Sequence, residues 1–178
     1  LALGSPMTPI ADNLVNTMGR VAVVDIGSNT VRLVVYDAPT RLPFPVFNEK
    51  AECGLVRGLN ETGYLNPNGV EEAIRSLQRF SLLSQSMNVE KMTLLATAAV
   101  REAKDGQAFV ERISMMLGLD VRVLSGEEEA RLSAFGLLSG RRLIDGLVAD
   151  IGGGSVDLVE VRRGQFGRSG TLPMGHLR

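Results

Sequence analysis

The sequence has little of the residue types that support disulfide, zinc or histidine chemistry. Its 178 residues include one cysteine, Cys53, one histidine, His176, and no tryptophan. A single cysteine excludes an internal disulfide and is typical of a protein from a reducing compartment. A lone histidine close to the C-terminus leaves nothing from which to build a zinc site or a serine–histidine triad.

Long apolar runs and an excess of one charge are also absent. No stretch approaches the roughly 18 consecutive apolar residues of a membrane span. Residues 1–19 lack the basic start and the apolar centre of a secretory signal, so we expect them to form a disordered tail. The net charge of −1 gives no basic field for a nucleic acid duplex or a membrane surface. We therefore expect a soluble, cytoplasmic protein.

What the sequence does contain is an internal repeat. The segments DIGSNTVRLVV, from Asp25, and DIGGGSVDLVE, from Asp150, each begin at the end of an apolar strand, with a turn and a second strand following. The two aspartates lie 125 positions apart (150 − 25). Because a repeat of this kind decides how a fold is assigned, we expect two related hairpins, each with a carboxylate beside an anion-binding loop.

Apolar periodicity predicts the order βββαβαβα, followed by βββ. The expected strands are 21–25, 31–36, 46–53, 91–97 and 121–124, then 147–150, 156–161 and 166–172; the expected helices are 67–86, 106–117 and 126–138. Asn66-Pro67 and Ser125 with Glu128 are typical helix starts, and Asp105 is a candidate cap for the second helix. Strand 21–25 is expected to be buried on both faces, with strand 91–97 parallel to its neighbour because a helix precedes it.

Three final strands without a covering layer would leave one sheet face exposed. We therefore expect residues 20–144 to form one α/β domain and residues 145–178 the truncated start of a second, in a chain that is a fragment. The alternative is a finished single domain in which the last strands extend the first sheet.

Asp25 and Asp150 are the first candidates for function. Each stands at the carboxyl end of a predicted strand, where open α/β sheets bind ligands. A buried carboxylate there needs a cation or hydrogen-bond donors, and two aspartates facing a cleft could share Mg²⁺ with phosphate oxygens and water. The alternative is that each aspartate caps its own turn.

Two loops are candidates for binding phosphate, because glycine allows close backbone approach and polar side chains add donors. The residues are Ser28, Asn29 and Thr30 in the first copy and Gly152, Gly153, Gly154 and Ser155 in the second. No G-x-x-x-x-G-K-[ST] motif is present, which excludes a P-loop site. Arg101, just after strand 91–97, could bind a terminal phosphate through its fork; an ion pair with Glu102 or Asp105 is the simpler alternative.

The acidic run Glu127-Glu128-Glu129 lies in the first turn of a predicted helix, where the helix dipole and the cap favour acids. Successive helical residues point about 100° apart, so at most two of the three can face a cleft. One that faced a water beside a bound phosphate would serve as a general base. Helical spacing and the helix dipole do not decide which of the three glutamates would be this base.

Four segments together resemble the exopolyphosphatase/guanosine pentaphosphate phosphohydrolase family, N-terminal part. They are VDIGSNTVRLVVYD, ATAAVREA, VRVLSGEEEARL and VADIGGGSVDLVEV, in this order. The family belongs to the ribonuclease H-like group of actin-like, Hsp70-like and sugar-kinase ATPases, so the resemblance implies an actin-like domain followed by the first strands of a second copy.

The resemblance also implies roles. Asp25 and Asp150 match metal-associated aspartates, the two loops match phosphate loops, and Arg101 matches an arginine thought to hold phosphate. Glu129, directly before Ala-Arg, matches the catalytic base. Asp157 stands at a further metal-side position where the family usually has glutamate, and its shorter side chain reaches about one methylene less.

The implied activity is hydrolysis of the terminal phosphoanhydride bonds of polyphosphate by Mg²⁺-assisted attack of water. The alternatives are guanosine pentaphosphate as the substrate, a non-catalytic sensor of polyphosphate or an alarmone, and a small-molecule kinase on the same fold. The expected partners are these phosphate compounds, with no nucleic acid duplex and no membrane. Uncovered strands would also allow a homodimer.

Overall fold

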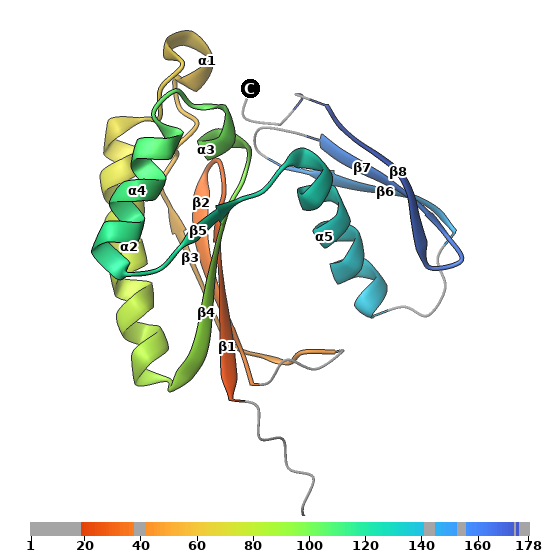
Figure 1. The fold of residues 1–178 in the computed structure, drawn as a ribbon, viewed down its shortest axis with the longest axis horizontal. Helices are drawn as coiled ribbons and strands as arrows, with labels where there is room; N and C mark the ends of the chain where they lie inside the picture. Colours follow the sequence, from red (N-terminus) through yellow and green to blue (C-terminus); the bar gives the residue numbers. More distant parts are fainter. Residues whose placement is uncertain (1–18, 38–41, 141–144, 153–155, 173, 175–178) are drawn as a thin grey trace, which may run out of the picture.

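The computed structural model describes residues 19–37, 42–140, 145–152, 156–172 and 174. They form a five-stranded sheet and a three-stranded sheet, with one helix lying between them (Figure 1). The predicted α/β class and the predicted strand order are confirmed.

The first sheet has the strand order β3-β2-β1-β4-β5. Its strands are β1 (Arg20–Ile26), β2 (Thr30–Tyr36), β3 (Pro45–Glu52), β4 (Val89–Ala96) and β5 (Val121–Val123). Strands β1 to β3 are antiparallel neighbours, whereas β4 is parallel to β1 and to β5. The carboxyl ends of β1, β4 and β5 therefore meet at one edge of the sheet, the usual ligand edge of such folds.

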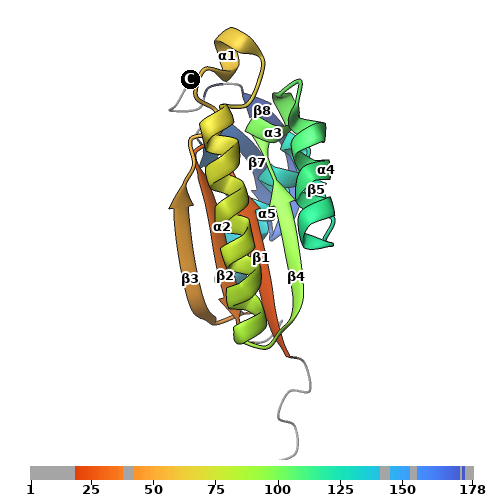
Figure 2. The same cartoon turned by 90° about the vertical axis from the view of Figure 1, so that its left-hand side faces the viewer.

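Helices α2 and α4 cover one face of this sheet (Figure 2). The helices are α1 (Leu59–Thr62), α2 (Pro67–Ser86), α3 (Ala98–Glu102), α4 (Gly106–Leu117) and α5 (Gly126–Ser139). Helices α1 and α3 are absent from the predicted order, because four or five residues are too few to show an apolar period. In the described ranges, no helix combines the length and the apolar character needed to cross a membrane.

The main core lies between the first sheet and helices α2 and α4. In β2 the buried Val31, Leu33 and Val35 alternate with the exposed Arg32, as expected for a strand with one covered face. In β1, Asp25 is exposed on the face of the sheet that α2 and α4 do not cover. The prediction that this strand is buried on both faces is therefore wrong. We call this uncovered face, which carries the Asp25 carboxylate, the open face of the sheet.

The second sheet consists of β6 (Gly146–Ile151), β7 (Val156–Arg162) and β8 (Gln165–Leu172), all antiparallel. Ala130 and Ala134 of α5 pack with Val159 and Val161 of β7 in a small separate core. Helix α5 therefore packs on the second sheet, although it precedes residue 145, where we placed the start of a second domain.

The helix starts are only partly as predicted. Ser125 forms the predicted capping box of α5: Glu128 N donates to Ser125 Oγ over 3.2 Å, and Ser125 N donates to the Glu128 carboxylate over 2.9 Å. Asn66 and Asp105 occupy N-cap positions without capping through their side chains. Instead, Asn66 Nδ2 donates to the Gly54 carbonyl and Asp105 accepts from Leu65 N, so both side chains fix the loop around α1.

Replacing Ser125 by alanine is expected to destabilise the protein by about 1 kcal/mol, because the N–H group of Glu128 in the first turn of α5 loses its acceptor. Urea unfolding followed by circular dichroism measures the difference. The control is Ser139→Ala at the other end of the same helix, where the hydroxyl donates only to the Gly136 carbonyl. Equal losses for the two variants would contradict a specific role for the capping box.

Candidate functional site

Backbone hydrogen bonds hold the carboxyl ends of three strands together. Thr97 N donates to the Ile26 carbonyl over 3.2 Å, and Leu124 N donates to the Ala96 carbonyl over 2.8 Å. Helix α3 begins directly after β4, and α5 begins shortly after β5. Both helices thus start at the edge of the sheet where β1 presents Asp25.

Arg101 of α3 and Glu129 of α5 meet at this edge. Arg101 Nη1 lies 3.2 Å from Glu129 Oε2 and also donates to the Leu124 carbonyl over 2.7 Å. The two side chains are 25% and 20% exposed, so the pair is mostly shielded from water. Arg101 thus pairs with Glu129, whereas Asp105, one of the two simpler partners that the sequence offered, accepts a hydrogen bond from Leu65 N.

The other two glutamates of the acidic run face elsewhere. Glu127 forms an exposed ion pair with Arg131 one turn along the helix, and Glu128 is shared between the capping box and Arg122. Their places agree with the favourable position of acids at a helix start. Of the three, Glu129 is the one paired with Arg101 beside the strand ends.

Burial raises the pKa of Glu129 above its ordinary value. The hydrogen bond from Arg101 acts in the opposite direction, while the charges of Asp157 and Asp25 raise the pKa further. Loss of solvation is the largest of these causes because it disfavours the charged carboxylate. A carboxylate of this kind accepts a proton more readily than an exposed one.

Asp25 lies near the end of β1, opposite Arg32 of β2. The residue is exposed on the open face of the sheet, yet the protein around its carboxyl group raises the pKa by desolvation. The Arg32 charge lowers this pKa and the Asp150 charge raises it. The two repeated aspartates are therefore close enough for their charges to interact.

Asp150 and Asp157 stand directly opposite each other on β6 and β7. Asp150 is exposed and accepts a hydrogen bond from Ser133 of α5, whereas Asp157 is only 3% exposed and accepts one from Thr171 Oγ1 over 2.6 Å. The expectation of a buried Asp150 is therefore wrong, and the buried carboxylate is that of Asp157. Cross-strand neighbours share one face of a sheet, so both aspartates lie on the side that holds α5.

The first candidate loop is tied to the segment after β3. The Asn29 carbonyl accepts from Cys53 N and Gly54 N, both over 2.8 Å, and the Ser28 carbonyl accepts from Val56 N over 3.0 Å. Thr30 closes the turn by accepting from Gly27 N. Within the described residues, the N–H groups of Ser28 and Asn29 donate to no other group. These donors suit an anion.

The second candidate loop is largely outside the described residues. Gly152 directly follows β6 and is described, whereas Gly153, Gly154 and Ser155 are not. The predicted role of these residues stays a prediction.

A cage of protein ligands for a metal is not found in the described part of the chain, where no three acidic, cysteine or histidine side chains converge. Mg²⁺ ordinarily keeps several waters and uses one or two carboxylates together with substrate phosphates. The facing carboxylates of Asp150 and Asp157, with Asp25 nearby, fit that mode of binding. They do not fit a site built from protein ligands alone.

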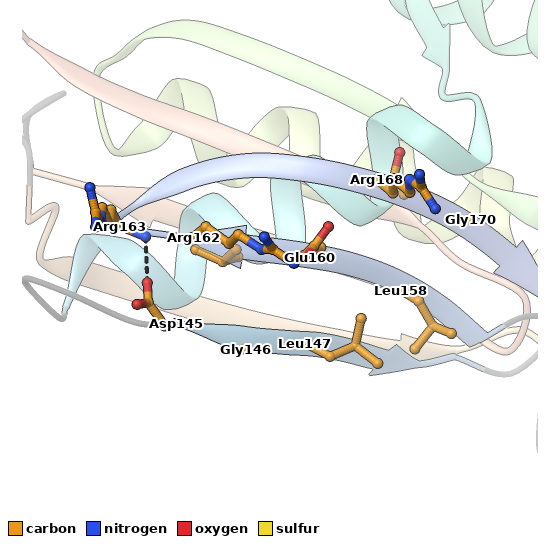
Figure 3. A pocket seen from close by; sticks show the side chains of 11 residues that line it. Asp145, Gly146, Leu147, Leu158, Glu160, Arg162, Arg163, Arg168 and Gly170 are labelled. Atoms are coloured by element: carbon orange, nitrogen blue, oxygen red, sulfur yellow. Dashed lines mark hydrogen bonds and ion pairs between the residues drawn. The ribbon is translucent and has the colours of Figure 1, made fainter.

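A hollow lined by residues of β6, β7 and β8 lies elsewhere, on the face of the second sheet turned away from α5. It encloses about 770 Å³. Leu147 and Leu158 line it together with several charged residues, and at one end Asp145 accepts a hydrogen bond from Arg163 N (Figure 3). The described residues that line it include none of the predicted site residues. The hollow is therefore separate from the group of carboxylates.

Ser133, Thr171 and the Leu124 carbonyl are parts of the site that the sequence did not indicate. Thr171 is 14 residues from Asp157, and Ser133 is 17 residues from Asp150. Nothing in the local pattern around a serine or threonine predicts such a contact, because strand pairing and helix docking create it.

Comparison with known proteins gives a consistent result. Residues 34–178 match the Ppx/GppA phosphatase family. Exopolyphosphatase 1 of Mycobacterium tuberculosis (strain ATCC 25618 / H37Rv) is 32% identical over 146 residues, covering 78% of this chain and 41% of that protein. Exopolyphosphatase 1 of Mycobacterium leprae is also 32% identical over 146 residues, with 78% and 42% covered.

Solved structures agree. The Ppx/GppA family member of Aquifex aeolicus matches with a TM-score of 0.78 and 31% identity, covering 89% of this chain and 52% of that one. An exopolyphosphatase of Cytophaga hutchinsonii gives a TM-score of 0.81 and 28% identity, with 88% and 51% covered. The predicted actin-like fold is confirmed. The chain spans about half the length of the relatives that it matches.

Proposed function

Because this chain belongs to the Ppx/GppA phosphatase family, we propose that it contributes the catalytic base and one phosphate-binding edge of a phosphohydrolase that acts on phosphoanhydride bonds. Polyphosphate is the proposed substrate and guanosine pentaphosphate the alternative. The observation that carries the proposal is the Arg101–Glu129 pair at the strand ends, beside Asp25, Asp150 and Asp157. A phosphate-binding guanidinium and a shielded carboxylate are what water attack on a terminal phosphate requires.

In this proposal Arg101 changes partner when substrate binds. Its fork is suited to two oxygens of a terminal phosphate, and the phosphate carries more charge than the Glu129 carboxylate. The terminal phosphate therefore takes over Arg101 and releases Glu129. Without the Arg101 hydrogen bond, which lowers its pKa, Glu129 becomes a stronger base at the moment when a water has to be deprotonated.

The remaining residues hold the phosphate and an ion. The N–H groups of Ser28 and Asn29 would donate to phosphate oxygens, together with Thr30 and the second loop. One or two of the carboxylates of Asp25, Asp150 and Asp157 would hold Mg²⁺, together with phosphate oxygens and water, and the ion would neutralise charge on the phosphate oxygens. The protein's own contribution is positioning and charge compensation, as in phosphoryl transfer generally.

We also propose the organisation that the family suggests. Residues 20–144 form a first actin-like domain and residues 145–178 belong to a second, with α5 as the connection that packs on the second sheet. The single cysteine, Cys53, is free and buried, in keeping with a cytoplasmic protein.

The proposed activity is tested by inorganic phosphate release from long-chain polyphosphate and from guanosine pentaphosphate. The assay uses this chain and the longest polypeptide that contains it, with Mg²⁺ and with a chelator as the control. Mg²⁺-dependent release from polyphosphate is the expected result. Phosphate release from guanosine pentaphosphate but not from polyphosphate would favour the alternative substrate. Binding of either compound without phosphate release would contradict the proposed enzymatic activity and favour a sensor.

A further inference from the structure

Thr171 occupies a position that links the buried carboxylate of the site to the helix bearing the proposed base. Its hydroxyl Oγ1 donates to Asp157 Oδ1 over 2.6 Å. The two residues stand directly opposite each other on β7 and β8. A carboxylate that is 3% exposed needs hydrogen-bond donors, and Thr171 is one of the partners of Asp157.

The same threonine touches the start of α5. A Cβ atom added at Gly126 would lie 2.1 Å from Thr171 Oγ1 and 2.9 Å from Thr171 Cβ. Real Cβ atoms do not approach that closely, so the absence of a side chain at Gly126 is what admits the hydroxyl group. Gly126 is the first residue of α5, and Glu129 lies three residues further on, a spacing that puts both on neighbouring parts of one helix face.

We propose that Thr171, seated in the notch at Gly126, is a positioning residue that fixes the Asp157 carboxylate relative to Glu129. Thr171 touches both β7 and α5, so one hydroxyl couples the metal-side carboxylate to the helix that carries the base. The roles of Asp157 and Glu129 in this inference rest on the proposed function. The contact itself, between Thr171, Asp157 and Gly126, does not.

The geometry separates Thr171 from a merely structural residue. Thr171 is exposed, so its hydroxyl adds little to the core. Ser133 makes a similar bond to Asp150, but that carboxylate is exposed and water can replace the hydroxyl group. At Asp157 burial limits that replacement, and the loss of the donor has to be met by movement of the carboxylate.

The test compares Thr171→Val, which keeps the shape and removes the hydroxyl group, with Thr171→Ser, which keeps the hydroxyl group. Partners that orient metal ligands are worth about 10- to 100-fold in metal affinity or activity. We expect Thr171→Val to weaken Mg²⁺ binding, measured by calorimetry in the presence of a non-hydrolysable triphosphate, by about that factor. Thr171→Ser is expected to restore binding, and phosphate release with saturating substrate should follow the same order.

A second variant tests the close contact between Gly126 and the Thr171 hydroxyl group. Gly126→Ala should displace the Thr171 hydroxyl group and reproduce the Thr171→Val loss with Thr171 intact. The double variant Gly126→Ala/Thr171→Ala is expected to lose no more Mg²⁺ affinity than the worse of the single variants Gly126→Ala and Thr171→Ala, because both changes break the same contact.

The outcomes distinguish this inference from the proposed function. Unchanged Mg²⁺ affinity in Thr171→Val, with only a lower melting temperature, would overturn the positioning role. A wild-type protein that binds Mg²⁺ and triphosphate but releases no phosphate would overturn the proposed enzyme, and the calorimetric comparison of Thr171 variants would still decide the inference. If the losses of Mg²⁺ affinity added up in the double variant, the two residues would not act through one shared contact.

Discussion

Replacing Glu129 by glutamine is expected to lower turnover by a factor of about 10² to 10⁴ while substrate binding is largely kept. Glutamine is nearly the same shape and can still accept a hydrogen bond from Arg101, so the pair at the strand ends remains, but an amide cannot take a proton from water. Steady-state phosphate release gives kcat, and a binding titration with non-hydrolysable triphosphate gives affinity. An active Gln variant would remove Glu129 from the role of base.

The same substitution has an expected effect on stability with a defined pH dependence. Burial raises the pKa of Glu129 in the folded state above its ordinary value of 4.5. Ionising the group therefore works against folding once the pH exceeds 4.5, and the full penalty applies above the raised pKa. Glu129→Gln should be more stable than the wild type at neutral pH, and this gain should disappear below pH 4.5. Thermal unfolding at pH 4 and pH 7.5 measures both.

Glu127→Gln is the matched control. Glu127 lies on the same helical turn, is exposed and pairs only with Arg131 among the contacts described. Its replacement should leave turnover and the pH dependence of stability close to those of the wild type. A loss of turnover as large as that of Glu129→Gln would mean that the whole acidic run, rather than one carboxylate, matters.

Removing the Arg101 guanidinium is expected to have the second large effect. Arg101→Ala should lower kcat/KM by about 10²- to 10³-fold, the usual loss when one donor to a reacting oxyanion is deleted. It should also move the acidic limb of the pH–rate profile to higher pH. The reason is that the Arg101 hydrogen bond and charge both lower the pKa of Glu129, so their loss lets that pKa rise.

Arg101→Lys separates charge from shape, because lysine keeps the positive charge but lacks the planar fork. This variant should keep the acidic limb near its wild-type position and still lose part of kcat/KM. Melting temperatures have to be compared as well, since Arg101 also binds the Leu124 carbonyl that follows β5. An acidic limb that stays in place in Arg101→Ala would contradict the coupling between Arg101 and Glu129.

Features that depend on neighbours along the chain could be predicted before the fold was known. The capping box at Ser125 is an example, because its two hydrogen bonds join residues three positions apart. The paired strand–turn–strand segments after Asp25 and Asp150 are another, since apolar runs and glycine turns specify a hairpin locally. The prediction failed for α1 and α3, which are too short to carry a period of their own.

Which candidate residues meet depends on contacts between distant parts of the chain. Helical spacing left three glutamates open; resemblance favoured Glu129, and the structure places that residue beside Arg101, 28 positions away. It also decided that Asp157, rather than Asp150, is buried, and that Thr171 reaches Asp157. These contacts join segments that local interactions do not hold together. They form when α5 docks on the second sheet and strands pair, and burial at these contacts then raises the pKa of Glu129.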